Sequence, residues 1–260
     1  MPTFTRYVAL GDSQTEGSWD GDDTVGLRGF ADRLAEELDR LHPGLAYANL
    51  AIRGRRIRDV LHEQLPQALA MEPDLVTVCV GMNDVTRPGR SFGDALLDLE
   101  RLYAALAQTG ATVVTTTFPD IVRILPVGRL LNGRVLLIND AIRDATQRHG
   151  FRLVDLYTAP SMNEIETWSP DRVHGSPRGH MLFAAAAAEA LELPGSSHDW
   201  ALPSASAEPW SFRSRARSQV LWTQNMPLPW AWRHLRGRSS GDGRTPRRPA
   251  LAQLDDELTN

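Results

Sequence analysis

The sequence predicts a three-layer α/β/α domain around a central parallel sheet of five strands. Five short apolar runs, rich in β-branched or aromatic residues, alternate with segments whose apolar residues recur at helical spacing. Short runs of this kind are typical of parallel strands covered on both faces. Strands that alternate with helices are joined by right-handed crossovers, and the connecting helices then cover both faces of the sheet.

The strand candidates, in chain order, are Tyr7–Leu10, Tyr47–Ile52, Leu75–Gly81, Thr112–Phe118 and Phe151–Tyr157. Apolar residues three to four positions apart predict helices between and after them, over Phe30–Leu41, Leu96–Leu106, Leu137–Ile142 and Met181–Leu191. Sites in parallel sheets gather at the carboxyl ends of the strands, and two polar residues, Ser13 and Asn83, follow such ends. The single cysteine, Cys79, lies inside a strand candidate and is interpreted as a core residue.

The composition is that of a soluble globular protein, with 42% hydrophobic and 23% charged residues. No apolar run approaches the length of a membrane span, and the first residues lack the pattern of a signal peptide. We therefore expect a cytoplasmic protein. The chain has no lysine, which excludes a P-loop lysine and Schiff-base chemistry.

The chain changes character after residue 195, so we expect an α/β domain over residues 1–195 and an extension over 196–260. Five of the seven tryptophans lie between residues 200 and 232, and nine arginines face one acid between residues 211 and 250. We expect the extension to pack partly on the domain and to be partly flexible. A weak contact with an anionic surface is also open, through Arg233, Arg236, Arg238, Arg244, Arg247 and Arg248. No specific nucleic-acid partner is expected.

The segment Gly11-Asp12-Ser13 directly follows the first strand candidate. A serine on the turn between a buried strand and a helix lies at the rim of the sheet, where backbone N–H groups can face a developing negative charge. The alternative is a helix-capping turn, which is the commoner role of such residues. Two later segments favour the catalytic interpretation.

The segment Asp171-Arg172-Val173-His174 supplies the groups that a serine nucleophile needs. Serine requires a base such as histidine, and the histidine requires a carboxylate that fixes its tautomer and orientation. An oxyanion hole completes such a site. Its candidate donors are the backbone N–H groups of Ser13 and Gly54 and the side-chain amide of Asn83. Asp12, Asp84 and His180 are interpreted as structural neighbours of the site.

These segments together resemble the SGNH, or GDSL-type, hydrolase family. The resemblance rests on four blocks in order: Gly11-Asp12-Ser13, Asn49 to Gly54, Gly81-Met82-Asn83-Asp84 and Asp171 to His174. It covers residues 5–192 and implies a flavodoxin-like fold. It also implies that Ser13 is the nucleophile, His174 the base and Asp171 its orienting acid. Gly54 and Asn83 would then be oxyanion-hole donors.

The expected function is a serine esterase that hydrolyses short-chain acyl or O-acetyl esters through an acyl-serine intermediate, without cofactor or metal. The substrate would be a small-molecule, lipid or carbohydrate ester. An acyltransferase or thioesterase with the same residues remains open, as does a non-catalytic binding module. The apolar segment Asp120–Leu131 is predicted to border the substrate pocket.

Overall fold

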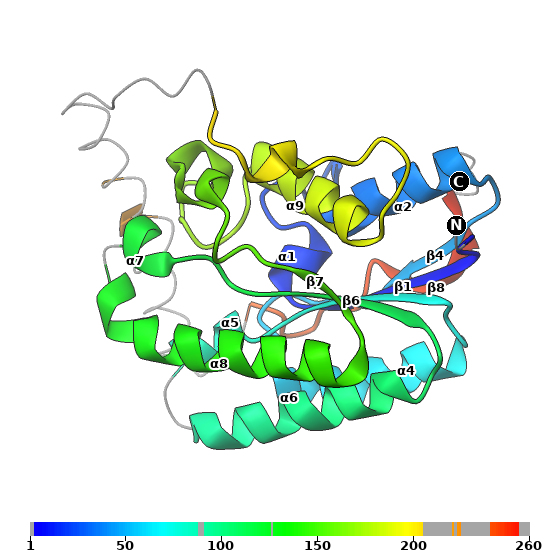
Figure 1. Ribbon diagram of the computed structural model, residues 1–260, viewed down its shortest axis with the longest axis horizontal. Helices are drawn as coiled ribbons and strands as arrows, with labels where there is room; N and C mark the ends of the chain where they lie inside the picture. The colour runs from blue at the N-terminus through cyan, green and yellow to red at the C-terminus, as the bar shows by residue number, and fades with distance from the viewer. Residues whose placement is uncertain are drawn as a thin grey trace.

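A computed structural model describes residues 3–87, 91–125, 127–204, 220, 223–224 and 240–254. Its centre is a six-stranded sheet with the strand order β7-β6-β5-β1-β4-β8 (Figure 1). The strands are β1 (Arg6–Gly11), β4 (Ala46–Asn49), β5 (Leu75–Cys79), β6 (Thr112–Thr116), β7 (Arg152–Val154) and β8 (Arg248–Gln253). All neighbours run parallel except β8, which pairs antiparallel with β4.

Helices cover both faces of the sheet, as Figure 1 shows. One face carries α2 (Phe30–Leu41) and α9 (Pro177–Ala190). The other carries α4 (Leu65–Ala70), α6 (Phe92–Ala107) and α8 (Gly128–His149). The shorter elements are α1 (Ser13–Glu16), β2 (Gly21–Asp22), β3 (Gly26–Leu27), α3 (Ile57–Asp59), η1 (Val60–Gln64), α5 (Met82–Thr86), α7 (Ile121–Ile124), η2 (Pro160–Asn163), η3 (Ile165–Thr167) and η4 (His198–Ala201).

Alternation along the strands divides the core into two layers. In β1, Tyr7 and Ala9 pack with α2 and α9, whereas Val8 and Leu10 pack with the helices of the opposite face. All four side chains are fully buried, because each residue of a central parallel strand faces a helix layer. The predicted α/β class, the five parallel strands and the four main helices are thereby confirmed.

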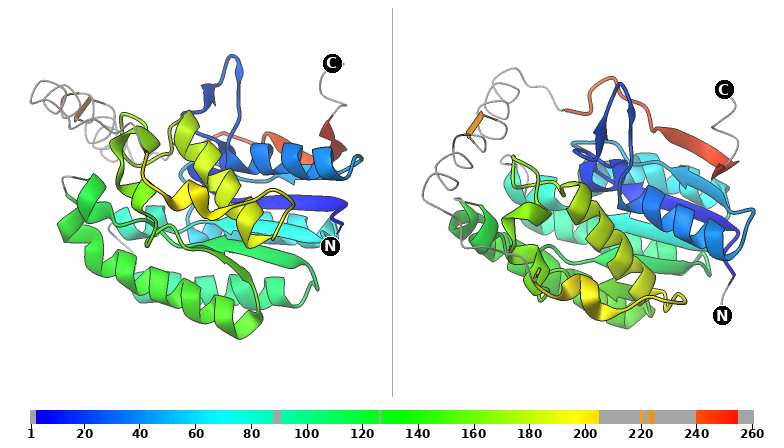
Figure 2. Two further views of the ribbon diagram at one scale, coloured as in Figure 1. Left: turned by 45° about the horizontal axis from the view of Figure 1, so that its top comes forward. Right: turned by 90° about the horizontal axis from the view of Figure 1, so that it is seen from above.

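The sheet has a sixth strand that the sequence prediction missed. Residues of β8 lie along the outer side of β4, with Ala46 opposite Gln253 and Asn49 opposite Arg248 (Figure 2). This corrects the prediction of five strands, because part of the extension completes the sheet. β8 is a half-exposed edge strand that contains Pro249, so it lacks the apolar alternation by which strands are recognised.

The first part of the extension also packs on the domain. Trp200 is buried in the core layer of α9, and its indole N–H donates to Glu189. Seven of the residues singled out in the extension lie outside the described residues: Trp210, Trp222, Trp230, Trp232, Arg233, Arg236 and Arg238. Within the described ranges, no helix combines the length and the apolar character needed to cross a membrane.

Candidate active site

Ser13 lies where β1 ends and α1 begins, at the carboxyl edge of the sheet. The Asp12 side chain caps α1 by accepting a hydrogen bond of 3.2 Å from the Gln14 N–H. The turn before it needs glycine, since Gly11 has φ +153° and a Cβ there would lie 2.4 Å from the Cys79 carbonyl oxygen. This tight turn directs the first residue of α1 towards the loop that carries His174.

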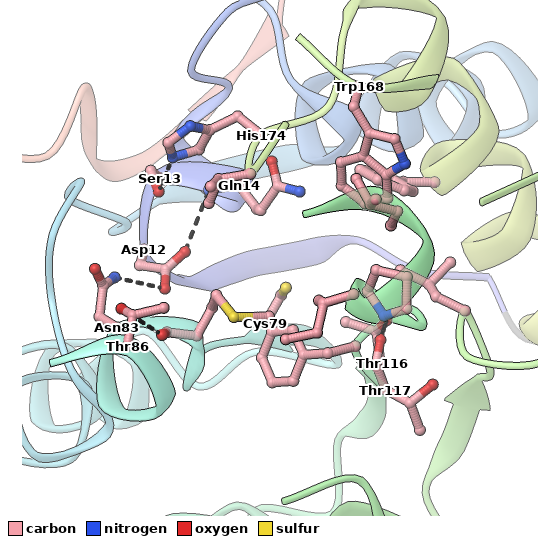
Figure 3. Close-up of a pocket in the computed structure, with 18 of the residues that line it drawn as sticks. Asp12, Ser13, Gln14, Cys79, Asn83, Thr86, Thr116, Thr117, Trp168 and His174 are labelled. Carbon is pink, nitrogen blue, oxygen red and sulfur yellow. Dashed lines mark hydrogen bonds between the residues drawn. The ribbon is translucent and has the colours of Figure 1, made fainter. Parts of the chain in front are cut away.

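A continuous hydrogen-bonded chain joins the three residues of the predicted triad. The Ser13 Oγ lies 2.7 Å from His174 Nε2, and His174 Nδ1 lies 2.6 Å from Asp171 Oδ2. Figure 3 shows Ser13 and His174 facing each other at one side of a pocket. A carboxylate on Nδ1 holds that nitrogen protonated, which leaves Nε2 free to accept the serine proton.

Asp171 is fixed in its ionised form by its surroundings. Its Oδ1 accepts hydrogen bonds from the Ser169 hydroxyl at 2.7 Å and from the backbone N–H groups of Val173 and His174 at 2.9 and 3.0 Å. Burial raises the pKa of Asp171, but His174 and these donors outweigh it and hold the pKa well below its usual range. Ser169 is a positioning residue that the sequence analysis did not identify.

The same pair sets the basicity of His174. Burial alone lowers the pKa of the imidazole, but the charge and hydrogen bond of Asp171 reverse this, so the pKa of His174 is raised above its ordinary value. The base is therefore stronger than a free histidine. This is the direction that favours removal of a serine proton.

Two of the three candidate oxyanion donors are available in this state. Across the described part of the chain, neither the Ser13 nor the Gly54 backbone N–H has a hydrogen-bond acceptor. Gly54 adopts φ +79°, a conformation that favours glycine. Both residues line the same cavity as His174. A substrate carbonyl placed there would find N–H groups without a competing partner.

Asn83, the third candidate, is already engaged. Its Nδ2 donates to Asp12 Oδ2 and to the Arg55 carbonyl oxygen, both at 3.0 Å (Figure 3). Asp12 thus links the cap of α1 to the start of α5. Burial raises the pKa of Asp12 to about 6. Its structural role was expected from the sequence, but its bond to Asn83 was not, because 71 positions separate the two residues.

Further contacts fix the loops around α1. The Gln14 Oε1 accepts a hydrogen bond of 3.0 Å from the Gly175 N–H, next to His174. The buried Glu16 carboxylate accepts two hydrogen bonds from Arg53, which precedes Gly54. The Arg53 Nε donates at 2.7 Å and the Arg53 backbone N–H at 3.2 Å. Helix α1, which begins with Ser13, therefore fixes both the loop that carries His174 and the loop that carries Gly54.

Residues 240–254 reach this same region. Gly241 packs so closely on the loop after β4 that a Cβ there would lie 2.2 Å from the Arg53 carbonyl oxygen. Arg244 forms an ion pair with Asp23, and Arg247 donates to the Glu16 carbonyl oxygen at 3.2 Å. We call residues 240–254 the C-terminal strap. Its described arginines pair with groups of the domain itself.

A cavity of about 740 Å³ opens beside Ser13. It passes the carboxyl ends of β5, β6 and β7 and reaches Trp168, directly after η3, and α9; Figure 3 shows Trp168 in its wall. The segment Asp120–Leu131 contributes to its wall, as the sequence predicts. Cys79 also lines the cavity, and burial raises the pKa of its thiol, so the thiol is protonated at neutral pH.

His180 lies next to the site but outside the hydrogen-bonded chain. Its Nδ1 accepts from the Phe30 N–H at 3.3 Å, and its Nε2 lies 3.1 Å from the Ser18 carbonyl oxygen, to which it donates. Burial lowers its pKa to about 4. Over the described ranges, no cluster of three or more His, Cys, Asp or Glu side chains could hold a metal ion.

The chain is similar to solved hydrolase and esterase structures over most of their length. LAE5, an alpha/beta hydrolase enzyme from the metagenome of Lake Arreo, is 23% identical with a TM-score of 0.59, covering 72% of this chain and 95% of that one. The acetylxylan esterase Axe2 from Geobacillus stearothermophilus is 20% identical with a TM-score of 0.60, covering 76% and 100%. The psychrotrophic esterase EstA from Pseudoalteromonas sp. is 15% identical with a TM-score of 0.56, covering 72% and 97%.

These identities establish a shared fold. No curated protein matches the sequence. The model of the GDSL-like lipase/acylhydrolase family, however, matches residues 9–182, which include the whole hydrogen-bonded chain from Ser13 to His174. The resemblance of the four sequence blocks and the α/β fold agree with that match. The chain therefore belongs to the GDSL-like lipase/acylhydrolase family and is an ester-hydrolysing enzyme.

Proposed function

We propose that this enzyme hydrolyses carboxylic esters through a covalent acyl-Ser13 intermediate. The observation that carries the proposal is the chain of hydrogen bonds from Asp171 through His174 to Ser13, with distances of 2.6 and 2.7 Å. These residues have the identities and the geometry that activate a serine. They also line a cavity that can hold a substrate.

The reaction proceeds in two halves. His174 Nε2 takes the Ser13 proton while Oγ attacks the ester carbonyl, and the resulting tetrahedral oxyanion collapses to the acyl-enzyme. The imidazolium gives its proton to the departing alkoxide, which leaves as the alcohol. A water molecule then loses a proton to His174 and attacks the acyl carbonyl. Collapse of this second intermediate returns the proton to Ser13 and releases the acid.

The oxyanion is stabilised by the backbone N–H groups of Ser13 and Gly54, with Asn83 as the third donor. Asn83 can contribute by sharing or exchanging the hydrogen bond that its amide gives to the Arg55 carbonyl oxygen. Its bond to Asp12 would keep the amide in place during that change. Asp171 stabilises the positive charge that His174 carries in both tetrahedral steps.

Release of p-nitrophenol from acyl esters tests the proposal. Ser13→Ala should lose at least about 10³-fold in kcat/KM, since removal of a nucleophile leaves only binding and oxyanion stabilisation. Ser197→Ala changes an exposed serine that does not line the cavity; it is the matched control and should retain wild-type activity. Intact-mass measurement after treatment with an organophosphonate should show one adduct, absent in Ser13→Ala. Turnover by Ser13→Ala close to that of wild type would refute the proposal.

Three further measurements separate the alternatives that the sequence leaves open. Transfer of the acyl group to an added alcohol in place of water would identify an acyltransferase. Faster turnover of the matching thioester would identify a thioesterase. Binding of an ester without any turnover by wild type would favour the non-catalytic module.

A further inference from the structure

The cavity beside Ser13 extends well beyond the space that an acetyl group requires. In Figure 3, Ser13 and His174 lie at one side of it, Trp168 and Thr116 lie at the other, and Cys79 lies between them. Its volume of about 740 Å³ falls in the range of about 300–1,000 Å³ that encloses drug-sized ligands. A methylene is close in size to a water molecule, whose share of liquid volume is about 30 Å³, so a chain of eight carbons fills only part of the cavity.

Much of the cavity wall is formed by apolar side chains. It comes from β6, from the loop after β7, from α7 and from α9: Val114, Leu156, Ile124, Phe183 and Ala187. Each of these side chains is counted among the buried hydrophobic residues. An aliphatic chain that enters this space exchanges contact with water for contact with these groups, and its binding is favoured by each methylene buried.

Three threonine hydroxyl groups on the wall already have hydrogen-bond partners within the protein. The Thr77 hydroxyl bonds the Tyr7 hydroxyl at 2.8 Å, and the Thr117 hydroxyl donates to Asp155 at 2.8 Å. The Thr116 hydroxyl donates to the Thr117 carbonyl oxygen at 2.9 Å. A sugar ring carries hydroxyls that need new partners when they are buried. The wall therefore suits a hydrocarbon better than a carbohydrate.

We propose that this cavity is an acyl chamber with room for a straight chain of at least about eight carbons, with the ester carbonyl at Ser13 and the chain along the apolar wall that includes Ala187. The inference rests on the proposed function, because it specifies the acyl group transferred to Ser13. It differs from the expectation of short-chain or acetyl esters, and from the acetylxylan after which the Geobacillus esterase is named. The alcohol half then lies at the mouth, outside the chamber.

The chain-length dependence of wild type tests the chamber directly. The p-nitrophenyl esters of acetate, butyrate, hexanoate and octanoate share one leaving group, so differences in kcat/KM report the acyl side. Each methylene that becomes fully buried contributes about fourfold. We expect octanoate to exceed acetate by at least about tenfold, since the chamber need realise only part of that gain. A profile that is flat or highest for acetate would overturn the inference.

Filling the chamber provides the second test. Ala187→Leu should lower kcat/KM for octanoate at least about tenfold more than for acetate, because the added side chain occupies chamber volume. Ala185→Leu, on the exposed side of the same helix, is the matched control and should leave the ratio unchanged. Thermal unfolding shows whether Ala187→Leu folds. If it does not, Cys79→Leu replaces it in the same test, because a leucine at the end of β5 also occupies chamber volume. An unchanged ratio in a folded variant contradicts the chamber.

These outcomes separate the two proposals. Hydrolysis of acetate that depends on Ser13, with no preference for longer chains, retains the proposed function and overturns the chamber. Absence of turnover on every ester and thioester refutes the proposed function, and the acyl-chamber inference, which rests on that function, is then refuted as well.

Discussion

Arg247 of the C-terminal strap ties three parts of the domain together, and its removal should be costly. Its guanidinium donates to Asp32 Oδ2 at 2.7 Å, to the Leu27 carbonyl oxygen at 2.7 Å and to the Glu16 carbonyl oxygen at 3.2 Å. Glu16 is the last residue of the nucleophile helix α1. Arg247→Ala therefore removes a charge partner and two hydrogen bonds at once.

The magnitude follows from the burial of the pair. The Asp32 side chain is 8% exposed and the Arg247 side chain is 26% exposed. Breaking a fully buried ion pair costs about 3–5 kcal/mol, because the remaining charge is left without its partner. The partial exposure of Arg247, the hydrogen bond that Asp32 accepts from the Gly29 N–H and the Arg248 guanidinium, 3.8 Å from Asp32 Oδ1, reduce this. We expect Arg247→Ala to lower the free energy of unfolding by about 2–3 kcal/mol at pH 7.

The loss should also depend on pH. Burial raises the pKa of Asp32 even with Arg247 present, and removal of Arg247 raises it further. A carboxyl whose folded-state pKa lies above its unfolded value takes up protons on folding. The folded state therefore gains stability relative to the unfolded state as the pH falls. The destabilisation of Arg247→Ala is expected to be largest near pH 7 and to shrink towards pH 4.

Urea unfolding followed by tryptophan fluorescence and circular dichroism measures these effects. Arg152→Ala is the matched control, because it breaks a pair with Glu192 in which the side chains are 48% and 74% exposed. Such pairs contribute about 0–1 kcal/mol. A loss in Arg247→Ala no larger than that in Arg152→Ala, or a loss independent of pH, would refute the reasoning.

Three further predictions concern the site. Activity (kcat/KM) should fall as the pH drops through the pKa of His174, which lies above its ordinary 6.5. Asp171→Asn should move this limb of a pH–rate profile to lower pH and reduce kcat by roughly 10³–10⁴-fold, and an unmoved limb would contradict the assignment. Asn83→Ala should reduce kcat by about 10²–10³-fold if it donates to the oxyanion, whereas an effect on unfolding alone would make it structural. His180 should destabilise the fold as the pH falls from about 6.5 to 4, because its folded-state pKa is lowered to about 4. His180→Gln should remove that slope from urea-unfolding data collected across this range, and a retained slope would exclude His180 as its source.

The sequence predicted those parts of the site that depend on neighbouring residues. Asp171 and His174 lie three positions apart, and Ser13 follows a buried strand directly, so local pattern and chemistry identify them. The apolar runs likewise located five strands, because a central strand needs apolar side chains on both faces. In each case the relevant information lies within a few residues.

Contacts that depend on distant segments could not be predicted in this way. The pairing of Arg53 with Glu16 and the bond of Asn83 to Asp12 follow from the arrangement of whole strands. β8 was missed for a further reason. An edge strand with Pro249 and Arg248 has neither the composition nor the alternation of a core strand.

The late position of β8 also has a consequence for the order of folding. Ala46 in β4 pairs with Gln253, about 200 residues later in the chain, which makes this the most non-local pairing in the sheet. During synthesis the outer N–H and C=O groups of β4 therefore stay unpaired after all five parallel strands have emerged. An open strand edge is a template for pairing with another chain. The nascent protein is thus most exposed to misassembly in the interval just before β8 docks.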